Sequence, residues 1–259
     1  MVSPSPPSRT VAVVCPHPDD ETIFCGGTIR RLADAGHRVV VVAATTGDAG
    51  VPDAGGADLA EVRARELAAA AEVLGVSAVH HLGFADSGLG PELPPGCLAA
   101  APVEEVAARL AEVLVREGVT ALVCDDVAGI YGHPDHVQVH RAGVLAAERA
   151  GVATVYEVTV DREHLHFVET HLVATATDAL AESAPGSPAV FGRATVEIDL
   201  VVDVGPALVA KRAAFAAHAS QLPPGSPVMV LDDDAFRAVY GLEWFCRRGE
   251  RGPIDDLVG

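Results

Sequence analysis

A short polar run, PHPDDE at positions 16–21, places one imidazole and three carboxylates directly after an apolar segment. His17 and Asp20 lie three residues apart on a turn that enters a predicted helix, so both side chains can point to one place, as metal ligands do. Asp19 then points elsewhere and is free to act as a base. The competing interpretation is that Asp19, Asp20 and Glu21 only cap the helix and favour its dipole. Capping alone explains neither His17 nor the two prolines that fix the turn.

A second polar cluster, YGHPDH at positions 131–136, follows another apolar segment. His136 has the spacing of a helical metal-ligand pair with either His133 or His140. The spacing alone leaves the choice among these three histidines open. Paired histidines on a helix are also common on protein surfaces, so this cluster gains its meaning only together with the first one.

The elements that would carry the two clusters alternate between strands and helices. Continuous apolar runs between amphipathic helices are typical of a parallel sheet covered on both faces. With right-handed crossovers, this predicts a Rossmann-like three-layer αβα sandwich with a mostly parallel sheet. The expected strands are 10–15, 37–44, 78–82, 120–125, 153–160, 195–204 and 243–247, and the expected helices are 21–36, 57–75, 102–118, 133–151, 206–221 and 232–240.

The predicted sheet brings the two polar clusters together. In the common strand order 3-2-1-4-5, the first and fourth strands are neighbours, and ligands bind outside their carboxyl ends. Both clusters directly follow these two strands. A His-Asp-His site with an open position is what a catalytic zinc ion requires. The same turn lacks the Gly-x-Gly-x-x-Gly of a nucleotide-binding protein, which argues against that class.

The remaining segments predict one domain. We expect a flexible leader over residues 1–9 and a single domain over residues 10–259. Loops 47–57 and 83–102 are rich in glycine and proline and follow strands, so we expect them at the ligand-binding edge. Segment 161–192 follows the fifth strand, and we expect either a specificity lid or a plain surface excursion there.

Composition limits the partners. The chain has 36 acidic and 18 basic residues, a formal net charge of −18 and a single lysine. Binding of nucleic acid or anionic lipid needs clustered Lys and Arg, so we expect neither partner. No apolar run approaches the roughly 18–20 residues of a membrane span, the N-terminal residues do not read as a secretory signal, and five scattered cysteines are typical of reduced thiols. We therefore expect a cytoplasmic protein that binds a small molecule, with a homo-oligomer left open.

The chain resembles the LmbE/PIG-L family of zinc-dependent N-deacetylases. The motifs that carry the resemblance span residues 10–247. They are PHPDDE (16–21), Arg63-x-x-Glu66-Leu67, Asp86, YGHPDHV (131–137), Lys211 with His218-x-Ser220-Gln221, and Glu243-x-Phe245.

The resemblance implies one zinc ion per chain, or another divalent metal, held by His17, Asp20 and His136. It also implies that Asp19 is the base that deprotonates a water molecule at the metal. This assignment suits amide hydrolysis, because zinc lowers the pKa of bound water from about 16 to about 7.

The resemblance further implies that His133, oriented by Asp135, stabilises charge or protonates the leaving amine. A neighbouring carboxylate commonly fixes the tautomer of an imidazole in this way. Tyr131 would donate a hydrogen bond to the oxyanion. Arg63 and Asp86 would hold sugar hydroxyl groups.

The implied activity is hydrolysis of an N-acetyl amide on a GlcNAc-type sugar conjugate, which releases acetate and a free amine. Expected substrates are GlcNAc-inositol or GlcNAc-malate precursors of thiol cofactors, or amino-sugar natural products of secondary metabolism. One alternative is a thiol-conjugate amidase of the same family, which removes a larger acyl group. A second is a non-catalytic metal- or sugar-binding homologue, although such a protein needs ligands but no spare base such as Asp19.

Overall fold

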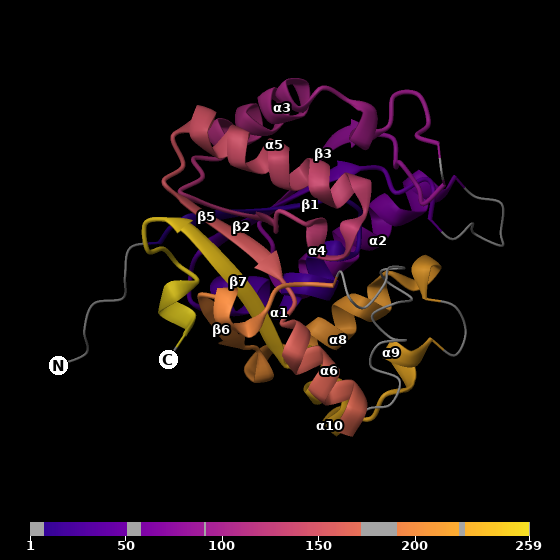
Figure 1. The fold of residues 1–259 in the computed structure, drawn as a ribbon, viewed down its shortest axis with the longest axis vertical. Coiled ribbons are helices and arrows are strands. Elements are labelled where there is room, and N and C mark those ends of the chain that lie inside the picture. The colour runs from indigo at the N-terminus through magenta and orange to yellow at the C-terminus, as the bar shows by residue number, and fades with distance from the viewer. Residues whose placement is uncertain (1–7, 51–57, 91, 172–190, 223–225, 259) are drawn as a thin grey trace.

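The computed structural model describes residues 8–50, 58–90, 92–171, 191–222 and 226–258 (Figure 1). Most of the predicted leader and most of segment 161–192 lie outside these described residues, as does part of loop 47–57. One seven-stranded sheet organises the described chain in the order β3-β2-β1-β4-β5-β7-β6. The strands are β1 (Thr10–Cys15), β2 (Arg38–Thr45), β3 (Ala78–Phe84), β4 (Ala121–Asp125), β5 (Thr154–Thr159), β6 (Leu200–Asp203) and β7 (Leu242–Gly249).

The sheet is mostly parallel, as predicted. Strands β1 to β5 pair in parallel, and β7 pairs antiparallel with both β5 and β6. The side chains of β1, β2 and β4 are almost all buried, because helices cover both faces of these central strands. This explains why their sequences are continuous apolar runs rather than alternating ones.

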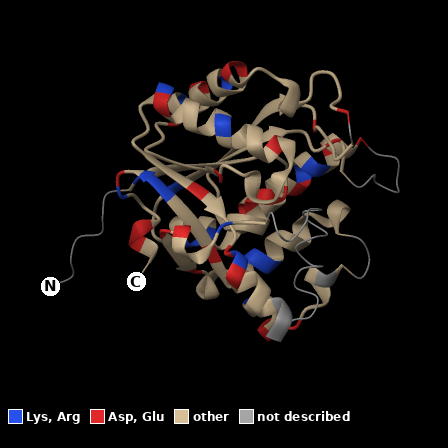
Figure 2. Ribbon diagram, viewed as in Figure 1, with Lys and Arg blue, Asp and Glu red and all other residues tan. Residues whose placement is uncertain are grey.

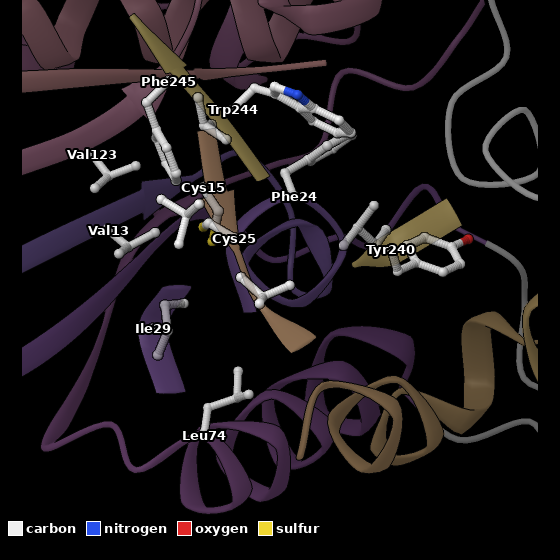
Figure 3. Close-up of a cluster of buried hydrophobic side chains, with 14 of the residues drawn as sticks. Val13, Cys15, Phe24, Cys25, Ile29, Leu74, Val123, Tyr240, Trp244 and Phe245 are labelled. Carbon is white, nitrogen blue, oxygen red and sulfur yellow. The ribbon is translucent and has the colours of Figure 1, made fainter. Parts of the chain in front are cut away.

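Two helical layers complete the sandwich. One layer consists of α3 (Val103–Arg116) and α5 (Pro134–Ala150), and the other contains α1 (Asp20–Asp34), α2 (Leu59–Leu74), α8 (Leu208–Ala217) and α10 (Asp233–Tyr240). The other α-helices of the described chain are α4 (Gly129–Gly132), α6 (Arg162–His171) and α9 (Pro227–Val230). Figure 3 shows part of the hydrophobic core between the sheet and the layer that contains α1. There Val13 and Val123, from neighbouring strands, lie near Cys15 and Ile29. The predicted αβα architecture is confirmed.

The predicted helix 206–221 is wrong in its last part. Helix α8 ends at Ala217, and Ala219–Gln221 forms a separate 3-10 turn. The backbone N–H and the hydroxyl of Ser220 both donate to the Glu66 carboxylate of α2, at 2.7 Å each. These bonds to another helix replace the next turn of α8.

The predicted strand 195–204 is also too long. Thr195–Glu197 is a 3-10 turn, and only Leu200–Asp203 pairs with β7. The backbone N–H of Thr195 donates to Glu163 of α6 at 2.7 Å, so this part of the chain is held by a helix and not by the sheet.

Candidate metal centre and active site

The two polar clusters meet at the carboxyl ends of β1 and β4, which are neighbours in the sheet as expected. A cavity of about 400 Å³ opens there, within the usual size range of small-molecule sites. Seven predicted site residues line it: His17, Asp19, Asp20, Arg63, Asp86, Tyr131 and His133. His136 lies behind them and is fully buried.

The three predicted metal ligands converge. Nδ1 of His17 lies 3.1 Å from Oδ2 of Asp20, and the same oxygen lies 3.4 Å from Nε2 of His136. Zinc bonds of about 2.0–2.2 Å in a tetrahedral site put ligand atoms roughly 3.3–3.5 Å apart. Two imidazole nitrogens and one carboxylate oxygen, all buried and within 4.8 Å of one another, therefore fit a divalent metal.

The outer nitrogen of each ligand histidine faces a further buried carboxylate. Nε2 of His17 lies 3.2 Å from Oδ2 of Asp135. Nδ1 of His136 lies 2.9 Å from Oδ2 of Asp125, although the alignment falls short of a regular hydrogen bond. Carboxylates in this place orient metal-binding histidines and make them better ligands. Asp125, which the sequence analysis did not assign, thus belongs to the candidate metal centre.

The electrostatics of this group favour a bound cation. Burial by itself lowers the pKa of His17, but hydrogen bonds to Asp135, Asp20 and Asp86 raise it well above its usual value. Burial would raise the pKa of Asp20, yet the charges of His136 and His17 hold it well below its usual range. The carboxylates around these imidazoles thus favour positive charge at this place, which a bound metal ion supplies.

We expect the Asp135→Asn substitution to weaken metal binding about 10–100-fold, which is the usual effect of removing a carboxylate behind a histidine ligand. Competition with a chromogenic chelator measures the affinity. Asp255→Asn is the matched control, because Asp255 is also a buried carboxylate that accepts a backbone N–H, but it contacts Tyr156 instead of the metal group. Equal affinity in the Asp135→Asn variant and the wild type would contradict the assignment.

The predicted pairing of the Asp135 carboxylate with His133 is wrong. This carboxylate accepts hydrogen bonds from the N–H and the hydroxyl of Ser87 and faces His17. Asp135 contacts His133 through its backbone N–H, which donates to Nδ1 at 3.1 Å. The reason is that His133 caps α5, so its ring folds back onto the first turn of that helix.

This contact defines the chemical state of His133. Because Nδ1 accepts a hydrogen bond, the neutral ring carries its proton on Nε2. Burial and the nearby His17 and His136 lower the pKa of His133 to about 4. At neutral pH, His133 is therefore an uncharged hydrogen-bond donor at the cavity wall.

Asp19 is held at the cavity in an unusual backbone conformation. Its φ is +142°, and its side chain makes no helix-capping hydrogen bond, which contradicts the capping interpretation for this residue. Its carboxylate lies 3.0 Å from Arg63, and its backbone N–H donates to Glu21 at 3.0 Å. Burial raises the pKa of Asp19 to about 6, although Arg63 opposes the rise. A base with this pKa suits proton transfer near neutral pH.

Arg63 is bound mainly by the protein itself. Its guanidinium donates to the carbonyl oxygens of Gly47 at 2.9 Å and Pro18 at 2.7 Å, in addition to its contact with Asp19. It thus ties the loops after β1 and β2 together beneath the cavity. The predicted contact of Arg63 with sugar hydroxyls remains a prediction.

Asp86 joins the loop after β3 to the same site. Its backbone N–H donates to Asp48 at 2.9 Å, and its carboxylate accepts the N–H of Gly88 at 2.8 Å. Burial would raise the pKa of Asp86, but His17, 3.4 Å away, lowers it to about 2. Asp86 is therefore an ionised acceptor at the cavity, as the binding of hydroxyl groups requires.

Tyr131 sits on a strained turn beside the ligands. Its hydroxyl lies 2.9 Å from Nε2 of His136, and its ring stacks on Phe191 at 5.8 Å. The preceding residue, Ile130, has a φ of +56°, and its N–H donates to the carboxylate of Asp126 at 3.0 Å. Through Phe191, the end of segment 161–192 packs against the ring of Tyr131.

The structure places the three histidines at and after the start of α5 in different surroundings. His136 joins His17 and Asp20, and His133 lines the cavity. Nδ1 of His140 instead lies 3.0 Å from the backbone carbonyl oxygen of Asp125, and His140 does not join His17 and Asp20 in the metal-fitting group.

Comparison with known proteins agrees with this geometry. A family profile described as "PIG-L: GlcNAc-PI de-N-acetylase" matches residues 12–147. A 1D-myo-inositol 2-acetamido-2-deoxy-alpha-D-glucopyranoside deacetylase of Kineococcus radiotolerans is 36% identical over 90% of this chain and 78% of its own length. A protein of the same name from Thermobispora bispora is 34% identical over 95% of this chain and 90% of its own.

A solved structure shares the fold. The N,N'-diacetylchitobiose deacetylase from Pyrococcus horikoshii superposes with a TM-score of 0.58 at 25% identity, covering 97% of this chain and 89% of its own. Among the described residues, no helix combines the length and apolar character needed to cross a membrane.

Proposed function

The chain belongs to the PIG-L family of de-N-acetylases, and we propose that it is a zinc-dependent hydrolase acting on GlcNAc joined to a small, uncharged aglycone such as inositol. It releases acetate and a free amine. The proposal places the whole activity in one domain over residues 10–259. All five cysteines are free and buried, which supports a reducing, cytoplasmic location.

The observation that carries the proposal is a metal-fitting group with a base at the same cavity. His17, Asp20 and His136 would hold the ion, and Asp19 lies beside them at the cavity wall. When bound, zinc supplies a Lewis acid and makes water acidic enough to act as a nucleophile near neutral pH. Asp19 would accept a proton from the attacking water and donate it to the leaving nitrogen.

Two hydrogen-bond donors at the cavity wall, His133 and Tyr131, would stabilise the oxyanion that develops on the substrate. His133 is neutral and carries its proton on Nε2, so its role is to donate a hydrogen bond and not to protonate the amine. The Tyr131 hydroxyl is the second donor, since burial raises its pKa well above the usual value and keeps it protonated. Losing one such donor typically costs about 10²–10³ in rate.

The charges at the cavity favour an uncharged aglycone. Among the described residues that line it, Arg63 is the only arginine and is paired with Asp19, and His218 is paired with Glu21. The segments outside the described residues contain no Lys, Arg or His in their sequence, so they add no cation. Figure 2 shows Asp and Glu spread over helices and strands throughout the molecule, consistent with the net charge of −18. A phosphate or carboxylate on the substrate would therefore find no unpaired cationic side chain at the described cavity wall and would be repelled by its carboxylates.

The test is acetate release by the zinc-loaded protein from two matched substrates, GlcNAc-inositol and GlcNAc-malate. We expect kcat/KM to be about tenfold or more higher for the inositol conjugate, because an unpaired anion must be desolvated in the cavity. Equal rates would contradict the uncharged aglycone, and no acetate from either substrate would contradict the deacetylase activity.

The two alternatives give different results in the same assay. A thiol-conjugate amidase would release a larger acyl group faster than acetate. A non-catalytic homologue would bind zinc and the sugar conjugate without turnover. The presence of Asp19 at the cavity argues against the second alternative.

A further inference from the structure

Two residues in the described chain, other than glycines, have a left-handed backbone conformation: Asp19 and Ile130. Such residues are rare because the side chain crowds the backbone, and the conformation persists only where neighbouring groups enforce it. Asp19 is the proposed base, and Ile130 directly precedes the proposed oxyanion donor Tyr131. Both strained residues therefore lie where the site needs a side chain aimed in an unusual direction.

A buried carboxylate holds the backbone at Asp19. Oε2 of Glu21 accepts the Asp19 N–H at 3.0 Å, and Oε1 accepts hydrogen bonds from Nε2 of His218 at 2.9 Å and from the Thr22 hydroxyl at 2.6 Å. Glu21 is fully buried and is absent from the described residues that line the cavity. Both of its oxygens are thus used within the protein, and neither reaches the substrate.

The partner of Glu21 comes from the far end of the chain. His218 directly follows the last residue of α8 and is buried. Burial alone would lower the pKa of His218, but the charge of Glu21 outweighs this effect, and the pKa lies above its usual value. The pair therefore behaves as a charge-assisted hydrogen bond that fixes the Glu21 carboxylate. Because the Glu21 carboxylate is fixed, its hydrogen bond with the Asp19 N–H fixes the orientation of the backbone at Asp19.

We propose that Glu21, anchored by His218, is a positioning residue that holds Asp19 in its strained conformation and so aims the base into the cavity. The inference rests on the proposed function in assigning Asp19 as the base. A carboxylate in the first turn of a helix can accept the N–H of the residue that precedes the helix. Here that residue is Asp19, whose φ is +142° and whose own side chain makes no capping bond, so the contact with Glu21 holds the strained residue itself.

The same arrangement recurs at the second strained residue. Oδ1 of Asp126, which is also fully buried, accepts the N–H of Ile130, while Oδ2 accepts the Thr159 hydroxyl at 2.6 Å. Each non-glycine residue with a left-handed backbone in the described chain is thus held by a buried carboxylate that another element anchors. This recurrence supports a positioning role for the carboxylate in both loops.

The first test is steady-state kinetics of the zinc-loaded Glu21→Gln variant with GlcNAc-inositol. The glutamine side chain has one accepting oxygen where glutamate has two, so it cannot accept hydrogen bonds from both the Asp19 N–H and His218. We expect kcat to fall roughly 10- to 100-fold, as for a displaced catalytic group, with KM within about twofold and zinc content unchanged. Asp255→Asn is the matched control, which we expect to keep the wild-type kcat. An unchanged kcat for Glu21→Gln would overturn the proposal.

A double-mutant comparison separates positioning from general damage. If Glu21 acts through Asp19, adding Glu21→Gln to Asp19→Ala leaves the residual rate unchanged. A further fall of tenfold or more would mean that Glu21 acts elsewhere. His218→Ala removes the anchor of Glu21 together with a side chain of the cavity wall, and we expect its effect on kcat to be smaller than that of Glu21→Gln and not to add to it.

A crystal structure of Glu21→Gln, or of His218→Ala if the first variant does not fold, provides a readout that needs no substrate. We expect φ of Asp19 to leave the left-handed region and its carboxylate to move away from Arg63. An unchanged Asp19 in the variant structure would refute the positioning role. This outcome is distinct from failure of the proposed function, in which the wild-type protein would release no acetate.

Discussion

Replacement of Asp19 by alanine lowers kcat about 10²–10⁴-fold, the range typical for loss of a positioned acid-base group. The effect is large because no other described carboxylate at the cavity is available for proton transfer. Asp20 would be a metal ligand, and Asp86 accepts the N–H of Gly88 and faces His17. The assay is acetate release from GlcNAc-inositol, with zinc content measured on the same samples.

Zinc content must stay at the wild-type level in the Asp19→Ala variant, because Asp19 does not belong to the group of three that fits the metal. Asp19→Asn is the companion variant, since it keeps the size of the side chain and removes the base. Full activity in either variant with zinc retained would show that another group takes the proton. Loss of zinc together with activity would instead make Asp19 a ligand.

The metal centre was predictable because its chemistry is encoded locally. His17 and Asp20 sit three residues apart after a buried strand, and His136 follows another such strand. The apolar runs predict a parallel sheet, and the sheet brings the ends of β1 and β4 together. Sequence spacing and one topological rule therefore predict that the two polar clusters meet, whereas the choice of His136 over His133 and His140 came from the family resemblance.

The supporting contacts were not predictable, because each joins residues that no pattern links. Glu21 and His218 are 197 positions apart, and His17 and Asp135 are 118 apart. The family resemblance implied that Asp135 orients His133. In the structure His133 caps α5, and its ring accepts the backbone N–H of Asp135. The Asp135 carboxylate points the other way and faces His17 in the loop after β1.

The lengths of the later elements were mispredicted for a related reason. The periodicity of residues 206–221 is helical throughout, but Ser220 bonds to Glu66 and the helix ends before it. Tertiary hydrogen bonds overrode local propensity at that position. Helix α8 ends directly before His218. The helical periodicity thus mispredicts the chain at the residue whose side chain contacts Glu21 beside the site.

Replacement of His136 by alanine removes zinc and lowers kcat/KM about 10³-fold or more. A bound metal supplies several kcal/mol of transition-state stabilisation, and each 1.4 kcal/mol corresponds to about tenfold in rate. His136 is fully buried between Asp20 and Asp125, so its loss also leaves two carboxylates facing an empty space without a cation. Zinc content and acetate release, measured together, check the prediction.

The matched control lies one turn further along the same helix. His140 is buried and contacts the backbone carbonyl of Asp125, so the His140→Asn variant tests the loss of a histidine from α5 without loss of a ligand. We expect it to keep zinc and most of the activity. Chelation of the wild-type protein must reproduce the effect of His136→Ala, and added zinc must reverse it. Activity that survives complete removal of the metal would contradict the zinc-dependent mechanism.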